Sequence, residues 1–139
     1  MNKNVLLVAI CLVVASCKLN QYKDGLRHGR WVFKDSTTTG ISISKGRFKK
    51  GNEIATWKFY ENEILYKTEK YKRSIIKVNY YYPGRKLKAQ GLNKQEMTAQ
   101  GLHWYYTGNW KYYSKPGKLD SSKFFYQGME VEKISLENK

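Results

Sequence analysis

Cys17 is the side chain in this sequence whose position most directly indicates a chemical reaction. It follows the small residues Ala15 and Ser16, at the end of an uninterrupted apolar run over 5–14. A thiol becomes a strong nucleophile once it loses its proton, and in that form it can be alkylated by a lipid donor. A charged start at Lys3, an apolar middle and a small-residue site together have the layout of a secretory signal. The apolar run is shorter than the roughly 20 residues that a membrane span needs.

The order Val14-Ala15-Ser16-Cys17 resembles the bacterial lipobox. The resemblance implies cleavage before Cys17, a thioether-linked diacylglycerol on its sulfur and a third acyl chain on its amine. Two or more chains anchor durably because each buried methylene contributes about 0.8 kcal/mol. Cys11 lies within the signal, so the cleaved chain would hold one acylated cysteine and no disulfide. Two alternatives stay open: an ordinary cleaved signal with an incidental cysteine, and an uncleaved anchor helix.

The other reactive side chains form no pattern typical of an active site. His28 and His103 are the only histidines, and neither has a second histidine or a carboxylate at metal-ligand spacing. Glu61 and Glu63 share a strand and could face one cleft, as the carboxylates of glycosidases must, but this spacing is commonplace. There is no glycine-rich phosphate loop and no nucleophile elbow. We therefore predict no enzymatic activity, no cofactor and no metal site.

Composition places the chain among small, basic, β-rich domains. The formal net charge of +15 becomes +14 when residues 1–16 and their one lysine are removed, and the remaining 123 residues suit one domain. Such an excess favours contact with polyanions such as nucleic acid, phospholipid headgroups or polysaccharide phosphates. Because the lysines are scattered and no block of five like charges occurs, a solvated lysine-rich surface is the favoured alternative.

A short aromatic phrase recurs along the chain and predicts strands. It reads "GRWVF" over 29–33, "ATWKFY" over 55–60 and "GNWKYY" over 108–113. Alternate residues of a strand share a face, so each tryptophan shares its face with the aromatic residue two positions later. The residue between them is a lysine in two of the three phrases and faces the other way. A sheet with one apolar and one polar face is usually antiparallel.

Turn signals separate these phrases from further strand-like runs. Pro83-Gly84 and Pro116-Gly117 predict hairpin turns, and Asn62-Glu63 occupies the matching place after the second aromatic phrase. We predict an all-β, antiparallel meander of about ten short strands, with the charged stretch 130–139 fraying at the end. The predicted organisation is a signal peptide over 1–16, a lipidated tether over 17–23, a repeat domain over 24–134 and a tail over 135–139.

The recurring phrases resemble the bacterial MORN-variant repeat family, also described as YwqK-type and antitoxin-like. The best copy is Gly108–Tyr113 followed by Gly117-Lys118-Leu119, and the resemblance covers roughly residues 24–130. Ala55 departs from the pattern because the family has a glycine there, and Asn62-Glu63 lacks the turn glycine. The resemblance implies an elongated sheet of stacked hairpins. It transfers no catalytic residue, and an antitoxin role conflicts with export of the chain.

Two functional hypotheses follow. The first is a non-enzymatic, membrane-anchored interaction or scaffold module of the cell envelope, whose aromatic, basic face contacts a protein or an envelope polymer. The second is direct binding of anionic lipid or polysaccharide through a basic, aromatic sheet face. Strand alternation turns part of the aromatic residues outward, where they could stack on sugar rings. The candidate binding face consists of Tyr81, Arg85, Tyr105, Lys111 and Tyr113.

The lipobox also predicts where the chain resides. We expect a lipid anchor at Cys17, and the outer membrane is favoured over the inner because Lys18, rather than aspartate, follows the cysteine. Nucleic acid suits the positive charge but is not expected as a partner of an exported chain. A glycosidase-like activity of Glu61 or Glu63 is kept as a third hypothesis, to be tested by mutating both.

Overall fold

The structure, a computed structural model, describes residues 18–135. Every regular element in this range is a β-strand, and each strand pairs antiparallel with the next one along the chain. The predicted all-β meander of about ten strands is confirmed. The strands are β1 (Gln21–Lys23), β2 (Leu26–Thr37), β3 (Gly40–Lys49), β4 (Asn52–Glu61), β5 (Ile64–Lys72), β6 (Ile75–Tyr81), β7 (Leu87–Thr98), β8 (Gly101–Tyr113), β9 (Leu119–Tyr126) and β10 (Met129–Ser135).

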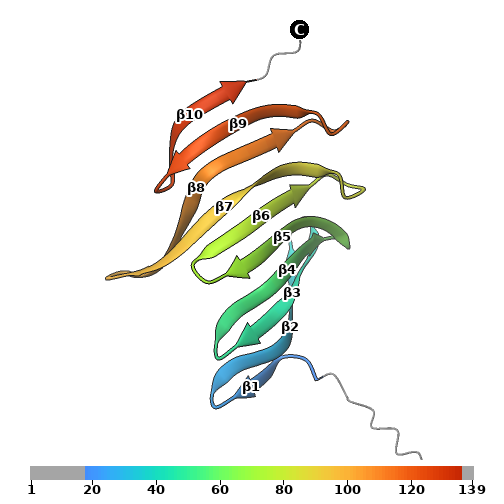
Figure 1. The fold of residues 1–139 in the computed structure, drawn as a ribbon. Coiled ribbons are helices and arrows are strands. Elements are labelled where there is room, and N and C mark those ends of the chain that lie inside the picture. Colours follow the sequence, from blue (N-terminus) through green and yellow to red (C-terminus); the bar gives the residue numbers. More distant parts are fainter. Residues whose placement is uncertain (1–17, 136–139) are drawn as a thin grey trace, which may run out of the picture.

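The ten strands form one twisted layer in chain order, with β1 and β10 at its two edges (Figure 1). Nine steps between neighbouring strands give the sheet a length of about 43 Å along its hydrogen-bonding direction. The sheet begins at Gln21, within the range assigned to the tether. The prediction of a fraying end is wrong for its described part, because Met129–Ser135 pairs with β9 over most of its length.

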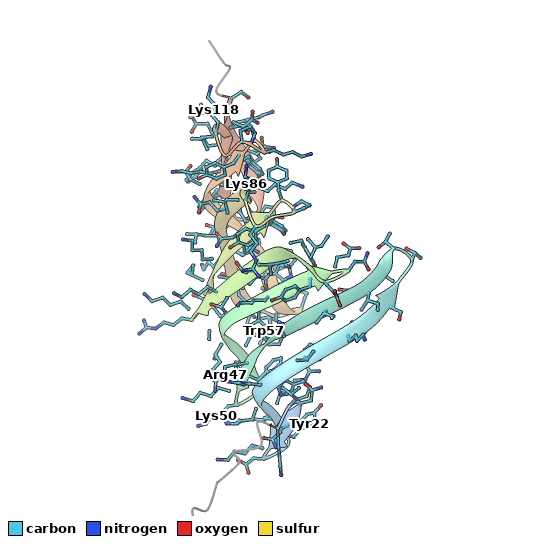
Figure 2. The ribbon with its side chains drawn as sticks, turned by 90° about the vertical axis from the view of Figure 1, so that its right-hand side faces the viewer. Tyr22, Arg47, Lys50, Trp57, Lys86 and Lys118 are labelled. Atoms are coloured by element: carbon cyan, nitrogen blue, oxygen red, sulfur yellow. The ribbon has the colours of Figure 1, made fainter. Side chains whose placement is uncertain are left out.

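Strand alternation divides the sheet into two faces, and one of them carries almost the entire core. We call it the aromatic face. In the view of Figure 2 the upper strands are seen nearly edge-on, and side chains project from both of their faces. Tyr71 packs against both buried clusters of the aromatic face and so connects them. The first cluster comprises Trp31, Phe48 and Trp57, and the second comprises Ile76, Val78, Trp110 and Phe125.

Ring-to-ring contacts let a single layer bury its tryptophans without a second sheet. The Phe48 and Trp57 rings meet edge to face at 5.0 Å, and Tyr106 lies 4.4 Å from Trp110. Such pairs contribute about 0.5–1.5 kcal/mol beyond the area that they bury. The guanidinium of Arg27 lies 5.3–5.4 Å from the ring centres of Trp31, Phe48 and Phe33, the last of which packs against the first cluster.

Two tryptophans of the aromatic face lie over glycines of the preceding strand. Trp57 covers Gly46 of β3, and Trp110 covers Gly91 of β7; a methyl group built on either glycine would overlap the indole ring. Both glycines sit where the strand register shifts, between β3 and β4 and between β7 and β8. The bulge and the missing side chain together make room for the large ring.

The small residue at the start of each aromatic phrase adopts a left-handed backbone. Its φ is +75° at Gly29, +59° at Ala55 and +65° at Gly108. Each of these residues precedes its tryptophan by two positions. At Ala55 and Gly108 the left-handed backbone lies within the bulge that shifts the strand register. Glycine adopts this conformation without penalty, whereas the Cβ of alanine clashes with the backbone. Ala55, which departs from the repeat pattern, therefore adopts the same left-handed backbone as the two glycines, but with strain.

The variant Ala55→Gly is expected to stabilise the fold. It should raise the free energy of unfolding by about 1 kcal/mol, because relief of the left-handed strain exceeds the added entropy of the unfolded chain. Urea denaturation followed by circular dichroism measures the change. The control is Gly29→Ala, where nothing lies within 4 Å of the added methyl group, so the same strain should appear as a loss. Loss of stability in Ala55→Gly would show that this backbone is not strained.

The indole N–H groups of the three aromatic phrases are not equally satisfied. Trp31 donates to the carbonyls of Gln21 at 3.2 Å and His28 at 3.1 Å, and Trp110 donates to that of Leu92 at 3.1 Å. The Trp57 Nε1 is buried and has no partner within the described residues. An unsatisfied buried donor costs about 1–3 kcal/mol. The aromatic phrase that starts at Ala55 therefore carries two costs, a left-handed alanine and an unpaired indole N–H.

The turns agree with the sequence signals. Pro83-Gly84 and Pro116-Gly117 lie in the connections from β6 to β7 and from β8 to β9. Asn62 and Glu63, which replace a Pro-Gly pair, have φ values of +47° and +67°, as in a two-residue type I′ hairpin. The Asn62 side chain also binds the neighbouring turn, accepting from the Ile41 N–H at 3.0 Å.

Candidate functional site: a basic face with two hollows

The face opposite the aromatic face carries like charges directly across from one another. We call it the basic face. Three cross-strand pairs are in direct register there, and in each of them both side chains are cationic. Directly opposite residues have Cβ atoms about 4.5–5.5 Å apart, and like charges at this position destabilise a sheet. The pairs are Arg30 with Arg47, Lys45 with Lys58, and Lys70 with Lys77.

No carboxylate neutralises these six cations within residues 18–135. The ion pairs of this part of the chain join Lys67 to Glu69 at 2.9 Å, Lys94 to Glu96 at 3.2 Å and Lys123 to Glu130 at 2.7 Å. Lys45 instead places its ammonium 4.5 Å from the ring centre of Tyr60. The fold thus accepts uncompensated repulsion on this face.

Two shallow hollows on the basic face repeat the same construction. The first, of about 290 Å³, contains Gly46 of β3, and its cations are Arg30, Lys45, Arg47 and Lys58. The second, of about 220 Å³, contains Gly91 of β7, and its cations are Lys77 and Lys111. Each hollow thus includes the glycine that a tryptophan covers on the aromatic face. The bulge that buries a tryptophan on one side also opens a cation-lined hollow on the other.

The structure brings three of the five predicted binding residues together on the basic face. The Tyr81 hydroxyl lies 3.2 Å from that of Thr68, the Tyr113 hydroxyl accepts from Gln90 Nε2 at 2.7 Å, and Lys111 lines the second hollow. The other two lie apart from this group. Arg85 is in the β6–β7 turn with φ +65°. Tyr105 lies on the basic face opposite Lys94, but it is only 8% exposed and belongs to neither buried cluster.

Sequence reasoning missed the cationic pairs. Arg30, Lys45, Arg47 and Lys58 alternate with apolar or small residues in their strands, a pattern that marks them only as outward-facing. Which cation faces which depends on hairpin register, and in β3–β4 the bulge at Gly46 changes that register. The distance in sequence between the partners therefore gave no signal.

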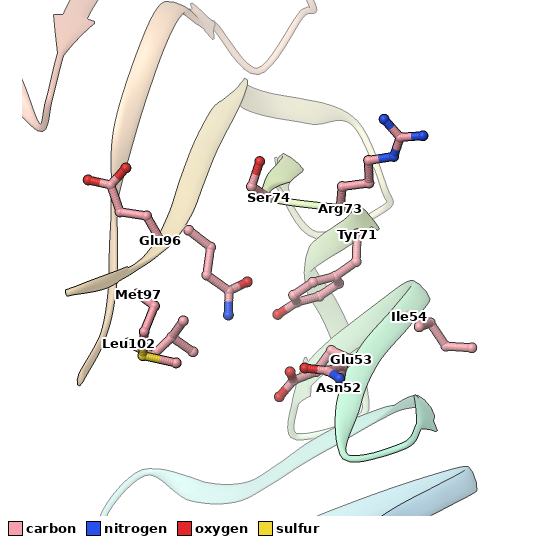
Figure 3. A pocket seen from close by; sticks show the side chains of 10 residues that line it. Asn52, Glu53, Ile54, Tyr71, Arg73, Ser74, Glu96, Met97 and Leu102 are labelled. Carbon is pink, nitrogen blue, oxygen red and sulfur yellow. The ribbon is translucent and has the colours of Figure 1, made fainter. Parts of the chain in front are cut away.

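The aromatic face has a second candidate site, a trough between β4, β5, β7 and β8. Two hollows of about 390 and 240 Å³ share Glu53, Tyr71, Gln95 and Leu102 as lining residues. Figure 3 shows Tyr71 and Glu53 on one side of the larger hollow and Met97 and Leu102 on the other. The exposed apolar side chains at its β7–β8 rim are Met97, Leu102 and Trp104.

Three ionisable groups of the trough, Lys67, Glu69 and Tyr71, are bound to one another. Glu69 accepts from the Tyr71 hydroxyl at 2.9 Å and pairs with Lys67 at 2.9 Å. Burial, reinforced by Glu69, raises the pKa of Tyr71 far above its ordinary value. Burial, with a contribution from Tyr106, raises the pKa of Tyr80 to about 12. Both phenols are therefore neutral at physiological pH and act as hydrogen-bonding groups.

The predicted acid pair does not share a hollow. Glu61 accepts a hydrogen bond from the Thr39 hydroxyl at 2.7 Å, while Glu63 lines a separate shallow hollow with Lys34. Within residues 18–135 no three histidine, cysteine or acidic side chains gather closely enough to hold a metal ion. The same range contains no helix that is long and apolar enough to cross a membrane. Cys17, the predicted lipid attachment site, and the signal 1–16 lie outside the described residues.

Comparison with known proteins returns no relative. No family model matches the sequence, no curated protein matches it, and no solved structure matches the fold. The resemblance to MORN-variant repeats therefore stays a prediction, and the candidate function depends on the geometry of the two faces.

Proposed function

We propose that the chain is a non-enzymatic, lipid-anchored module of the bacterial cell envelope whose basic face binds a polyanion. The observation that carries the proposal is the set of three like-charge pairs in direct register without acidic partners. Such pairs weaken the free sheet, and an anionic ligand would relieve their repulsion. The proposal thus selects direct anion binding, the second of our two hypotheses, as the activity of the envelope module.

The predicted lipid anchor gives this face an orientation. Cys17 precedes β1 by four residues, which span at most about 14 Å when fully extended. An acylated Cys17 would therefore hold the β1 edge close to the membrane. The opposite edge, β10, would lie at the end of the sheet away from the membrane. Both hollows lie between these two edges and would face the envelope space.

The interaction-module hypothesis with a protein partner has its own supporting observation. Met97, Leu102 and Trp104 expose large apolar side chains at the end of the β7–β8 hairpin, and exposed apolar patches are typical of protein-binding surfaces. Capture of one envelope protein by the wild-type chain, and its loss in Trp104→Ala, would favour this second candidate.

Anionic and neutral surfaces distinguish the proposed function from a merely solvated lysine face. We expect the chain over residues 17–139 carrying Cys17→Ser, which lacks the apolar signal and cannot be acylated, to bind phosphatidylglycerol vesicles or polygalacturonate, and to bind neither phosphatidylcholine vesicles nor dextran. Binding should weaken steeply as salt rises to about 0.15 M, where the Debye length is about 8 Å. Co-sedimentation and fluorescence anisotropy measure both. Equal binding to charged and neutral surfaces, or no binding to either, would overturn the proposal.

A further inference from the structure

We infer that the polyanion is an acidic polysaccharide that lies across the strands of the basic face, from β3 to β8. This inference rests on the proposed anion binding by that face. It is carried by a continuous row of side chains, each in register with the next on the neighbouring strand. The row, which we call the polar row, consists of Lys45, Lys58, Thr68, Asn79, Gln90 and Lys111.

The polar row has cations at its two ends and uncharged hydrogen-bonding groups between them. Lys45 and Lys58 lie at the first hollow, and Lys111 lies at the second. From β3 to β8 there are five steps of about 4.8 Å, so the row extends over about 24 Å. A ligand that occupies both hollows must therefore be a chain, because a single small anion reaches only one of them.

The middle of the row presents amides and hydroxyls rather than charge. The Tyr81 hydroxyl lies 3.2 Å from that of Thr68 and accepts from Asn79 Nδ2 at 3.3 Å. The Asn79 Oδ1 is buried without a partner among the described residues, and the Gln90 amide donates to the Tyr113 hydroxyl at 2.7 Å. An unpaired buried acceptor costs about 1–3 kcal/mol, which a donor from a ligand would recover. Rotation about the last side-chain torsion of Asn79, which has a broad energy minimum, would turn the Oδ1 toward the ligand.

This arrangement favours a polysaccharide over a lipid headgroup surface. A sugar polymer carries both anionic groups and hydroxyls along one line, so it can satisfy cations at the ends and neutral polar groups in the middle. An anionic bilayer attracts basic residues through its surface potential wherever they lie and makes no demand on uncharged side chains. The hydroxyls of the half-buried Tyr81 and Tyr113 would not contribute to binding at such a surface.

Oligomers of galacturonate test the length requirement, with the chain over residues 17–139 carrying Cys17→Ser as the protein. Because the second anchored site acts as an intramolecular binding event, affinity should rise at least tenfold as the oligomer becomes long enough to span both hollows. Beyond that length it should level off. Isothermal titration calorimetry gives the affinities. Affinity that is independent of oligomer length would overturn the inference, because it would place binding at single hollows.

Two glutamines of β7 supply the matched variants. Gln90 belongs to the polar row, whereas Gln95 lies on the aromatic face, and both are partly buried. Gln90→Leu is expected to weaken galacturonate binding about tenfold and leave phosphatidylglycerol binding unchanged, and Gln95→Leu should change neither. Thermal melts test whether both variants fold. If Gln90→Leu does not fold, Thr68→Val replaces it as the variant of the polar row.

The outcomes separate this inference from the proposed function. Binding to phosphatidylglycerol vesicles with no binding to galacturonate oligomers would leave anion binding intact and refute the polysaccharide. Equal losses for both ligands in Gln90→Leu would also refute it, because the polar row would then contribute to general charge alone. Failure of both anionic ligands to bind would remove the proposed function itself.

Discussion

Replacing Trp110 with alanine is expected to lower the free energy of unfolding by about 3–5 kcal/mol, the range typical of a buried tryptophan. Trp110 is 1% exposed, lies over Gly91, and packs 4.4 Å from Tyr106. Its indole N–H also satisfies the Leu92 carbonyl. In a single-layer sheet no second layer can move in to fill the space, so the lost contacts are not recovered.

Trp104→Ala is the matched control, because it removes the same side chain from the same strand. Trp104 is 59% exposed at the rim of the trough, so its loss should change stability by about 0.5 kcal/mol or less. Urea denaturation followed by far-ultraviolet circular dichroism compares the two variants without relying on tryptophan fluorescence. Similar losses in both would mean that Trp110 does not organise the second cluster.

The glycine beneath the ring should also be sensitive to substitution, although less so than the ring itself. Gly91→Ala adds a methyl group where the Trp110 indole already lies, and overpacking of this kind costs about 1–3 kcal/mol. Gly101→Ala is a poor comparison because its backbone is left-handed at φ +113°, but Ser122→Ala in β9 changes a partly buried basic-face position without such contact. Trp57 and Trp110 each depend on one glycine of the preceding strand, which explains why a glycine-containing strand comes before each of these two phrases.

Composition and alternation were enough to predict the meander, and the repeat phrase identified three tryptophans of the aromatic face. Each of these follows from local rules, because a strand must alternate and a Pro-Gly pair must turn. No aromatic phrase of this kind lies in the 53-residue interval between Trp57 and Trp110. In the structure Val78 lies in this interval, pairs with Gly91 and is 1% exposed, so an aliphatic residue takes the place of a tryptophan there.

The remaining features depend on pairing over distance and had no local signal. The glycine that receives each tryptophan lies in the preceding strand, eleven residues away for Trp57 and nineteen for Trp110. Bulges shift the register at both places, so the like-charge pairs cannot be read from alternation alone. β10 was missed because its charged residues resemble a tail, although charged side chains also suit an edge strand that must not recruit another sheet.

Uncompensated charge on an otherwise well-packed sheet indicates that stability has been given up for a surface property. The aromatic face buries three of its four tryptophans, whereas the basic face keeps cations opposite cations. Natural chains that carry such a conflict usually do so at functional positions. Relief of the conflict by mutation should therefore act on stability and on binding in opposite directions.

The double variant Lys58→Glu, Lys77→Glu is expected to show this opposition. It converts two like-charge pairs, with Lys45 and Lys70, into opposite-charge pairs, which should raise the free energy of unfolding by about 0.5–1 kcal/mol for each. At the same time two cations of the binding face become anions. With about 1 kcal/mol per charge near an anionic surface, affinity for an acidic polymer should fall about a hundredfold or more at low salt.

The double variant Lys23→Glu, Lys115→Glu is the control, because it lowers the net charge equally at a β1 position and in the β8–β9 turn. If general charge governed binding, the two double variants would lose affinity alike. If the basic face governs it, the control should lose only a few-fold and gain no stability. A face variant that binds less well and is also less stable would point to damaged folding, and the trade of stability for anion binding would be rejected.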